Sequence, residues 1–510
     1  MGITRRNFCI KTLGAGVALP TLSSLTLPTM AFGASRGATY MNPVLPGDHP
    51  DAGAIRVGDD FFLTHSSFDY APGLYIWRSR DLVNWDLASA ALQKYYGSVW
   101  APYLCEHEGQ FYIYFPCNNQ LHVVHAPNPL GPWSEPVNLG VNAIDPAHVA
   151  DGGHRYLYFA GGNMLELSAD GLSVKEPPRK VFEAWPIPKD IRVECECLEA
   201  PKVFKRGEYF YLTVAEGGTA GPPTSHMVVS ARSKSPGGPW EYSPYNPVVH
   251  TGSRDERWMS MGHGRLVEAA DGGWWMTLHS YENGFRSLGR QMLLLPVEWT
   301  ADGWFRIPKG VTADKPITMM SGGKAQAPPP DLSDEFTSPE LSLRWQFWRD
   351  FDKGRFHTGD GKLVLSAKGT SLADTSPLTT ITGDHAYSIE VDVEPEPGCE
   401  AGLLLFYNSE HSCGIRIGSD GIGVRLATGY NAETGVKASK ATLRVVNDRQ
   451  VVDFYYRLPG GEWKRTQESA EVASVNHNVL GGFLDLRPAL YACGAGHATF
   501  RSFRYRRLES

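Results

Sequence analysis

Three acidic residues stand in uncharged, turn-like settings far apart along the chain. Asp51 follows a His-Pro pair, Asp145 lies between Ile and Pro, and Glu199 precedes an Ala-Pro pair. Each comes shortly before a run of aromatic and β-branched residues. Carboxyl groups that meet in one site can act as general acid and general base, provided that one is protonated and another is ionised. Since most of the 55 acidic residues are expected to be solvated, this chemistry depends on whether the fold brings these three together.

A repeated phrase indicates the elements that would position them. A Gly/Asp turn followed by aromatic and β-branched residues occurs five times, at residues 58–63, 109–114, 153–158, 207–212 and 273–278. Each copy predicts a hairpin turn entering a strand, and the spacing leaves room for the four short strands of a propeller blade. A second turn-rich phrase, ending at Trp85, Trp133 and Trp240, predicts connectors at the blade rim.

We therefore expect an all-β protein in which residues 38–320 form a five-bladed β-propeller. The first strand of each blade lines the axis of a propeller, so acids placed before those strands could converge at one end. The alternative is a β-sandwich with aromatic strands, but a sandwich needs no motif at such regular intervals. Residues 321–330, rich in Pro and small residues, predict a linker. Alternating strands over residues 331–510 predict a β-sandwich of concanavalin or jelly-roll type.

The N-terminus has the pattern of a twin-arginine export signal. Adjacent Arg5 and Arg6 precede a mildly apolar run, and Pro20 and Pro28 argue against a buried helix in it. We expect residues 1–34 to be a signal peptide and the mature protein to be periplasmic or secreted. No other stretch approaches the ~20 apolar residues of a membrane span, so no membrane insertion is predicted.

The composition narrows the range of partners. A formal net charge of −7 argues against nucleic acid, which needs a basic face, and a neutral ligand fits better. The cysteines beyond the signal do not resemble a dense disulfide framework, so we expect most to be buried thiols. Cys195 and Cys197 lack a second pair at zinc spacing, which argues against a metal role. The sequence makes no prediction of the oligomeric state.

Six short motifs, in order along the predicted propeller, resemble those of glycoside hydrolase family 43. They are residues 42–51, 99–102, 144–146, 199–201, 262–264 and 288–290. The C-terminal residues, with the segment 369–374, resemble the accessory sandwich of the xylosidase-like members of that family. The sequence departs from the usual family pattern near each acid, at Ala52, Ala147 and Ala200. These departures bear on the shape of the sugar subsites more than on the carboxylates.

The resemblance implies an inverting mechanism with one role for each acid. Asp51 is expected to be the general base that activates water, and Glu199 the general acid that protonates the glycosidic oxygen. Asp145 is expected to hold the pKa of the acid high and to orient it. Inversion requires base and acid to lie about 6.5 to 9.5 Å apart, with room for a water molecule.

The resemblance also implies substrate contacts. Phe68 and Trp100 match positions that present aromatic walls to the sugar, with core packing as the alternative. Arg290 matches an arginine that hydrogen-bonds the terminal sugar, with a rim salt bridge as the alternative. His263 matches a histidine near the axis where relatives hold calcium or another small ion, and a hydrogen-bonded core histidine is the alternative. No nucleotide or redox cofactor is expected to be required.

The expected function is release of terminal pentose from hemicellulose-derived oligosaccharides, as by a β-xylosidase or an α-L-arabinofuranosidase. Arabinan or galactan cleavage is the alternative specificity, because a fold does not decide the substrate. A retaining relative with an Asp nucleophile would place its carboxyl groups only about 5 to 5.5 Å apart. A non-catalytic carbohydrate-binding propeller is a further alternative, but it would be expected to lack one of the acids.

Overall fold

The protein is nearly all β-structure, with a five-bladed β-propeller followed by a β-sandwich. The structure is a computed structural model that describes residues 38–426 and 430–508. The predicted signal, residues 1–34, lies outside the described residues. Among the residues that are described, no helix is long and apolar enough to cross a membrane.

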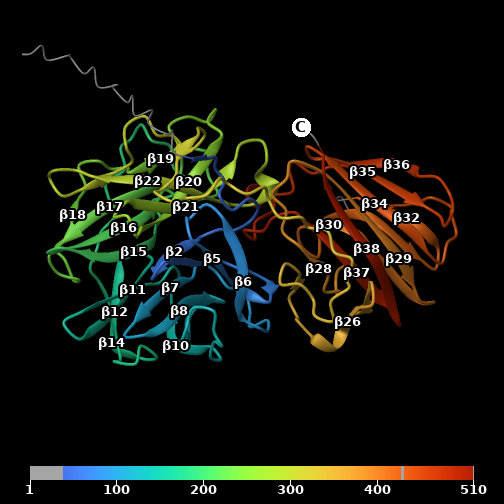
Figure 1. The fold of residues 1–510 in the computed structure, drawn as a ribbon, viewed down its shortest axis with the longest axis horizontal. Coiled ribbons are helices and arrows are strands. Elements are labelled where there is room, and N and C mark those ends of the chain that lie inside the picture. Colours follow the sequence, from blue (N-terminus) through green and yellow to red (C-terminus); the bar gives the residue numbers. More distant parts are fainter. Residues whose placement is uncertain (1–37, 427–429, 509–510) are drawn as a thin grey trace, which may run out of the picture. The chain divides into compact units, whose positions relative to one another are not determined.

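Each blade is a four-stranded antiparallel sheet whose strands follow one another in sequence (Figure 1). Blade 1 holds β2 (Gly53–Val57), β3 (Asp60–Thr64), β5 (Gly73–Ser79) and β6 (Trp85–Leu92), and blade 2 holds β7 (Tyr103–His107), β8 (Gln110–Cys117), β9 (Gln120–Ala126) and β10 (Val137–Asn142). Blade 3 holds β11 (Ala147–Asp151), β12 (His154–Phe159), β13 (Asn163–Leu167) and β14 (Val174–Lys180). Blade 4 holds β15 (Leu198–Arg206), β16 (Tyr209–Glu216), β17 (Met227–Ser233) and β18 (Glu241–Tyr242), with β19 (Val249–His250) also paired to β17. Blade 5 holds β20 (Trp258–Glu268), β21 (Trp274–Glu282), β22 (Gln291–Trp299) and β23 (Phe305–Arg306).

The repeated phrases occupy equivalent places in the blades. All five Gly/Asp turns connect the first strand of a blade to its second, and the Trp-ending phrases connect third strands to fourth. At Gly58 and Gly109 the backbone φ is +61° and +78°, a left-handed conformation that glycine adopts without a steric penalty. The strand before each glycine is the first of its blade, as the sequence predicts.

The chain closes on itself near the end of the propeller. The short strand β1 (Thr39–Tyr40) pairs antiparallel with β24 (Ile317–Thr318). The linker then runs along the first blade, where the backbone N–H of Lys324 donates to Asp81 at 3.2 Å and that of Ala327 to Asn84 at 2.7 Å.

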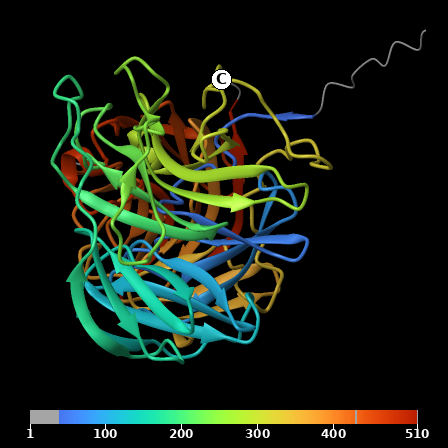
Figure 2. The ribbon, with the colours of Figure 1, turned by 90° about the vertical axis from the view of Figure 1, so that its left-hand side faces the viewer.

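Two antiparallel sheets form the sandwich, drawn in orange and red in Figures 1 and 2. One has the order β33 (Asn431–Glu433), β32 (Gly421–Arg425), β31 (Ser412–Gly418), β30 (Cys399–Phe406), β37 (Arg487–Gly494), β28 (Leu378–Thr379), β25 (Gln346–Trp348) and β4 (Tyr70–Ala71). The other has the order β26 (Phe356–Gly359), β27 (Lys362–Ser366), β38 (His497–Arg507), β29 (Ala386–Pro395), β34 (Ala441–Asp448), β35 (Val451–Arg457) and β36 (Lys464–Glu471). Short helical turns are η1 (Arg286–Leu288), η2 (Lys353–Arg355) and α1 (His477–Leu480).

The sandwich sheet continues into the propeller. Its edge strand β4 belongs to the segment between β3 and β5 of the first blade and pairs with β25. Phe68 and Tyr70, both 2% exposed, belong to the same hydrophobic cluster as the interior of the sandwich. The joint between the two folds is therefore a shared apolar core.

The cysteines differ in one respect from the expectation of buried thiols. Cys105, Cys117, Cys399, Cys413 and Cys493 are free and buried. Cys195 and Cys197 instead form a disulfide across a single residue, directly before β15.

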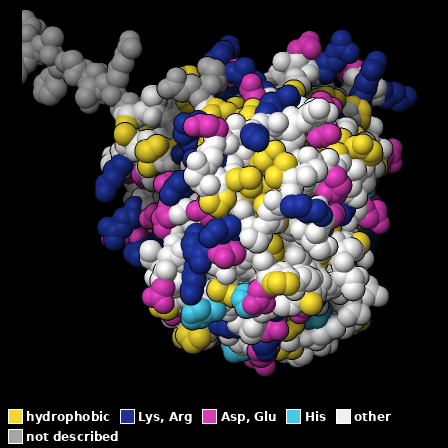
Figure 3. Space-filling model, turned by 90° about the vertical axis from the view of Figure 1, so that its right-hand side faces the viewer, with side chains coloured by type: hydrophobic (Ala, Val, Ile, Leu, Met, Phe, Trp, Pro, Cys, Tyr) yellow, Lys and Arg dark blue, Asp and Glu magenta, His cyan; other side chains and the backbone are white. Residues whose placement is uncertain are grey.

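On the face of the molecule in Figure 3, acidic and basic side chains are interspersed. No patch of a single sign dominates that face. This agrees with the modest net charge of the chain.

Candidate active site

The three predicted acids lie at the same level of three blades. Asp51 and Asp145 come directly before the inner strands β2 and β11, and Glu199 is the second residue of the inner strand β15. The φ angles are +62° at Asp51 and +57° at Asp145, and Ala200, after the third acid, has +50°. Left-handed backbone at non-glycine residues is uncommon and concentrates at functional sites. The turns therefore aim these side chains in a way that a regular strand would not.

Asp51 is buried and held by cationic and neutral donors. Its Oδ1 lies 3.0 Å from Nη1 of Arg290, 3.0 Å from Nδ1 of His263 and 3.1 Å from Nδ1 of His279. The Ser66 hydroxyl donates to its other oxygen. Burial alone would raise the pKa of Asp51, but the charges of Arg290 and His263 outweigh burial and hold that pKa well below its usual range.

One imidazole ring lies between Asp51 and Glu199. While Nδ1 of His263 faces Asp51, its Nε2 lies 3.9 Å from Oε1 of Glu199. Burial lowers the pKa of His263, but the two carboxylates raise it more, to about 9. His263 is therefore an imidazolium at neutral pH, and each of its ring nitrogens lies near one of the two acids.

Asp145 acts on the backbone beside Glu199. The N–H of Ala200 donates to Oδ2 of Asp145 at 2.9 Å, which ties the start of β15 to blade 3. Burial and the charge of Glu199 raise the pKa of Asp145 to about 6, although His263 opposes them. All three predicted acids are thus connected through two neighbours, His263 and Ala200.

The proton affinities of the acid pair differ from the sequence-based expectation. Asp145 was expected to keep the pKa of Glu199 high. Burial does raise it, but His263 and His226, whose Nδ1 lies 3.8 Å from Oε1, leave the pKa of Glu199 below its usual range. When the free protein takes up one proton at this pair, as the pH falls to about 6, the proton therefore goes to Asp145 before Glu199.

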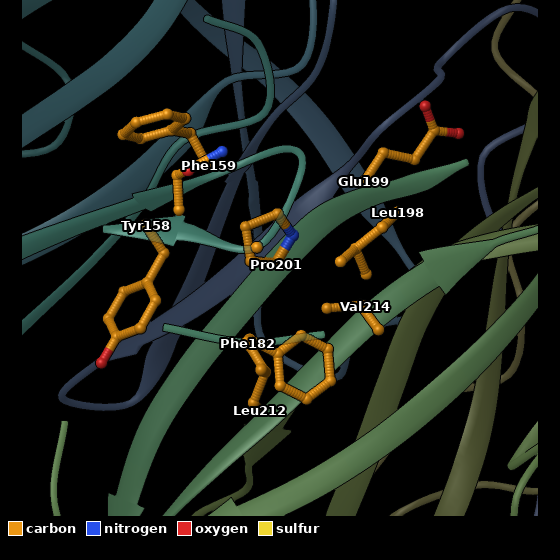
Figure 4. Close-up of a pocket in the computed structure, with 10 residues that line it drawn as sticks. Tyr158, Phe159, Phe182, Leu198, Glu199, Pro201, Leu212 and Val214 are labelled. Atoms are coloured by element: carbon orange, nitrogen blue, oxygen red, sulfur yellow. The ribbon is translucent and has the colours of Figure 1, made fainter. Parts of the chain in front are cut away.

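The Glu199 side chain is 21% exposed, whereas that of Asp51 is 4% exposed. Figure 4 shows the Glu199 carboxylate pointing away from a small apolar cavity lined by Pro201, Leu198 and Val214. The cavity is packing space behind the acid, and the carboxylate faces the other way. Glu199 is thus the more accessible of the two carboxylates beside His263.

An aromatic cluster surrounds Arg290. Phe68 stacks on Phe483 of the sandwich with ring centres 6.3 Å apart, and Trp100 meets Phe483 edge-on at 5.9 Å. The Arg290 guanidinium carbon lies 5.7 Å from the Phe68 ring centre and 5.1 Å from that of Phe483. The His477 ring stacks on the Phe483 ring, with ring centres 3.7 Å apart. Phe68, Trp100 and Arg290, the three predicted sugar contacts, thus lie together. One guanidinium nitrogen of Arg290, however, contacts Asp51.

Sequence reasoning missed several residues of this site, including Ser66 and His226, which contact the acids directly. Phe483 and His477 come from the segment between β36 and β37, and no local pattern connects them to residues 400 positions earlier. His279 accepts the N–H of Asp51 on Nδ1 at 3.0 Å, so it is neutral on that nitrogen, and it belongs to the second strand of blade 5. Its only sequence signal is a lone histidine in a buried strand.

The histidines near the axis do not fit calcium. His226, His263 and His279 offer nitrogen atoms within 4.8 Å of one another. Calcium takes six to eight oxygen ligands, whereas imidazole nitrogen suits zinc, copper or nickel. His263 also carries a positive charge at neutral pH, because Asp51 and Glu199 raise its pKa to about 9. The imidazoles by themselves therefore do not supply the oxygen ligands that calcium takes, and an ion at His263 stays a prediction.

Fold and site together define a propeller glycosidase with an appended sandwich. The chain belongs to the family described as Glycosyl hydrolases family 43, which matches residues 40–305. Residues 333–506 match the Beta xylosidase C-terminal Concanavalin A-like domain. The resemblance found in the sequence is confirmed, and the protein is a glycoside hydrolase.

Curated relatives match over nearly the whole chain. A non-reducing end α-L-arabinofuranosidase of Bacteroides ovatus, BoGH43B, is 30% identical over 90% of this chain and 92% of its own length. A xylan 1,3-β-xylosidase of a Vibrio species is 28% identical over 92% of this chain and 99% of its own. Among solved structures, BlXynB of Bacillus licheniformis superposes with a TM-score of 0.82 at 27% identity, covering 92% of this chain and 100% of the other.

Proposed function

We propose that this hydrolase releases a terminal pentose from hemicellulose-derived oligosaccharides with inversion at the anomeric carbon. The observation that carries the proposal is that His263 lies within 4 Å of both Asp51 and Glu199, one at each ring nitrogen, while Asp145 accepts the N–H of the residue after the acid. Inverting enzymes hold their two carboxyl groups roughly 6.5 to 9.5 Å apart, with a water molecule between them, and these contacts are compatible with that spacing.

Asp51 is the proposed general base. Arg290 and His263 keep it ionised, and Ser66 and His279 fix its orientation. A water molecule beside Asp51 gives its proton to the carboxylate while its oxygen bonds to the anomeric carbon. An ionised, oriented base removes the need for the enzyme to rearrange charges during the reaction.

Glu199 is the proposed general acid, and it must be protonated before it acts. The glycosidic oxygen can only accept a hydrogen bond, so a sugar bound beside Glu199 favours the protonated form of that carboxyl. The negative charge of Asp145 beside Glu199 also favours the protonated form of Glu199, and solvent supplies the proton before the sugar is cleaved. The glycosidic bond breaks as the Glu199 proton passes to the leaving oxygen.

The aromatic cluster supports action at chain ends. Phe68, Trp100 and Phe483 pack together beside Arg290, so the sandwich closes one side of the site. A closed side leaves room for a terminal sugar and not for a chain that continues past it. Relatives named as an arabinofuranosidase and a xylosidase favour a pentose at that position.

The test is a panel of 4-nitrophenyl pentosides and hexosides, with NMR observation of the anomer formed first. We expect hydrolysis of β-D-xyloside or α-L-arabinofuranoside and release of the inverted anomer. Release of the retained anomer would contradict the assignment of Asp51 as a base. Arabinan or galactan fragments as the best substrates would correct the specificity, and no turnover of any glycoside would favour a binding protein.

We also propose that the protein is exported through the twin-arginine route to the periplasm or beyond. Support comes from Arg5 and Arg6 before an apolar run and from a polysaccharide substrate class that lies outside cells. Replacing both arginines by lysine is expected to leave the precursor in the cytoplasm of a bacterium with that route. Unchanged export of that variant would contradict the proposal.

A further inference from the structure

Asp48 lies in the same loop as Asp51, the proposed base, and holds the backbone of Arg290, directly before β22. It is 2% exposed, and its Oδ1 accepts the backbone N–H of Arg290 at 2.9 Å. In return, the N–H of His49 donates to the carbonyl of Arg290 at 3.0 Å. Gly289 has a φ of +74°, and a side chain there would collide with the Asp48 carboxylate. Asp48 therefore determines where the backbone of Arg290 lies, next to Asp51.

The sandwich supplies the cation that faces Asp48. Arg487, the first residue of β37, is 2% exposed, and its Nη2 lies 3.7 Å from Oδ2 of Asp48. Its Nε donates to Asp485 at 2.6 Å and its Nη1 to Gln346 at 2.8 Å. Its guanidinium carbon lies 3.5 Å from the centre of the Tyr70 ring. Asp48, Asp485 and Gln346 thus contact the edges of the Arg487 guanidinium, and the Tyr70 ring lies against one of its faces.

Two neighbouring hydrogen bonds tie this arginine to the propeller. The N–H of Leu486 donates to the carbonyl of Ser287 at 2.8 Å, two residues before Gly289. The side-chain amide of Gln346 donates to the carbonyl of Pro72 at 2.8 Å. The position of Arg487 relative to Asp48 is therefore set by the joint between the two folds.

Charge makes Asp48 dependent on Arg487. Among the described residues no group donates a hydrogen bond to its Oδ2. Burial and the neighbouring Asp485 raise the pKa of Asp48 well above its usual range, although the charges of Arg487 and Arg290 oppose them. Removing one partner of a buried ion pair leaves a charge that must find water or a proton. Without Arg487, the Asp48 carboxylate would protonate or move, and it would carry the Arg290 backbone with it.

We propose that Arg487 of the sandwich is a positioning residue for catalysis: through Asp48 it fixes the Arg290 backbone and hence the guanidinium that holds Asp51. The inference deepens the proposed function and rests on Asp51 being the base. Arg487 acts through Asp48 and the Arg290 backbone, so its effect is expected on the proton affinity and the position of Asp51.

The test is the pH dependence of kcat/KM for R487M and R487K on the best nitrophenyl pentoside. Loss of Arg487 loosens the Arg290 contact, so the pKa of Asp51 rises and the acidic limb moves to higher pH, by about 1 unit. Near neutral pH, where Asp51 stays ionised in the variant, kcat/KM is expected to fall about tenfold, mainly through kcat, because the base is held less firmly and not because it is protonated. R487K retains the charge without the fork and is expected to shift the limb less. The other groups that face Asp51, His263 and His279, are unchanged in these variants.

The matched control is R416M in the same sandwich sheet. Arg416 is also buried, at 6% exposed, and its carboxylate partners Glu400, Asp420 and Glu433 all belong to the sandwich. It is expected to lower the melting temperature without moving the acidic limb. If R487M and R416M both lose stability while the limb of R487M stays in place, the positioning role is wrong.

Two further results keep the inference testable. If R487M does not fold, an unmoved acidic limb in R487K overturns the inference by itself. D51N separates it from the proposed function: an active D51N would refute Asp51 as the base, whereas an inactive D51N with unmoved limbs in both Arg487 variants would refute only the positioning role.

Discussion

The neighbouring charges differ between Asp51 and Glu199, the two carboxylates that lie beside His263. Arg290 touches Asp51, so the ionised form of Asp51 is favoured even in a buried place. Glu199 is partly exposed and has Asp145 behind it, so a proton can be exchanged within the pair. Both pKa values lie below their usual ranges in the free protein, so the proposed acid role of Glu199 depends on a bound sugar to favour its protonated form.

The role of Glu199 predicts a dependence on the leaving group. E199Q cannot donate a proton, so kcat/KM on a pentose disaccharide is expected to fall about 10² to 10⁴-fold. A nitrophenolate leaves with little protonation, and the loss on the nitrophenyl glycoside is expected to be at least tenfold smaller. The measurement is kcat/KM for both substrates.

The matched control for that experiment is E216Q. Glu216 is a fully buried carboxyl whose pKa burial raises to about 7, so the amide resembles its protonated form. The ratio of kcat/KM on the disaccharide to kcat/KM on the nitrophenyl glycoside is expected to be the same in E216Q as in the wild type. Equal losses of E199Q on both substrates would show that Glu199 is not the acid.

His263 predicts a stability change with pH. Its pKa is raised to about 9 in the folded protein, above the ordinary 6.5 of histidine, so its stabilising charge is present below pH 6.5 and lost as pH rises through 9. From pH 6.5 to 9 the unfolding free energy of the wild type is expected to fall by up to about 3 kcal/mol more than that of H263Q. Denaturant unfolding across that range is the measurement.

H226Q is the control for this pH dependence. Burial lowers the pKa of His226 to about 4, so it stays neutral across the range and its replacement leaves the slope unchanged. Parallel curves for H263Q and the wild type would mean that His263 is not an imidazolium in the folded protein.

Strands and turns explain why much of the fold could be predicted. A glycine turn between the first and second strands is a local signal, and it marks the inner strand of every blade. The acids stand just before or within those inner strands, so the repeat located them. The resemblance added the roles of Phe68, Trp100 and Arg290, and the structure places all three in one cluster.

The remaining parts of the site depend on contacts without a local pattern. His279 meets His263 across the pair β20 and β21 of blade 5, and His226 of blade 4 reaches His263 only when blades 4 and 5 pack together. The pKa order of Asp145 and Glu199 depends on the His263 charge, which no turn or spacing indicates. The pair Asp48 and Arg487 joins residues of the two folds, and either one alone is an ordinary charged residue.

The segment that carries Phe483 predicts an effect on affinity. Phe483 packs on Phe68 and Trp100, so F483A removes an aromatic side of the site, and kcat/KM on a short xylo-oligosaccharide is expected to fall about 10- to 100-fold. Opening that side is also expected to raise the activity on polymeric xylan relative to the short substrate. The measurement is kcat/KM on both.

V479A in the same segment is the matched control. Val479 is 62% exposed and belongs to α1, so its truncation removes little buried surface. It is expected to behave as the wild type. An unchanged ratio of the two substrates in F483A would show that Phe483 does not limit access.

At the scale of the whole molecule, the interior of the sandwich extends to residues of the propeller. Strand β4 of the first blade is the edge strand of a sandwich sheet, and Tyr70 packs within the sandwich cluster. Few contacts cross the boundary between two independent domains. Here the contacts are apolar, and a separated propeller would expose the faces that they cover.

This shared interior predicts that the propeller does not work alone. A protein of residues 38–325 would expose Phe68, Tyr70 and the edge of β4, and it would lose Phe483 and Arg487 together. We expect it to aggregate, or to fold with kcat/KM on short xylo-oligosaccharides reduced by more than 10-fold, because both the aromatic side and the support of Asp48 are missing. Expression of this fragment beside the whole chain, with size-exclusion chromatography and activity on the same substrates, is the measurement. A monomeric fragment with the kcat/KM of the whole chain would show that the sandwich neither shapes the site nor positions its base.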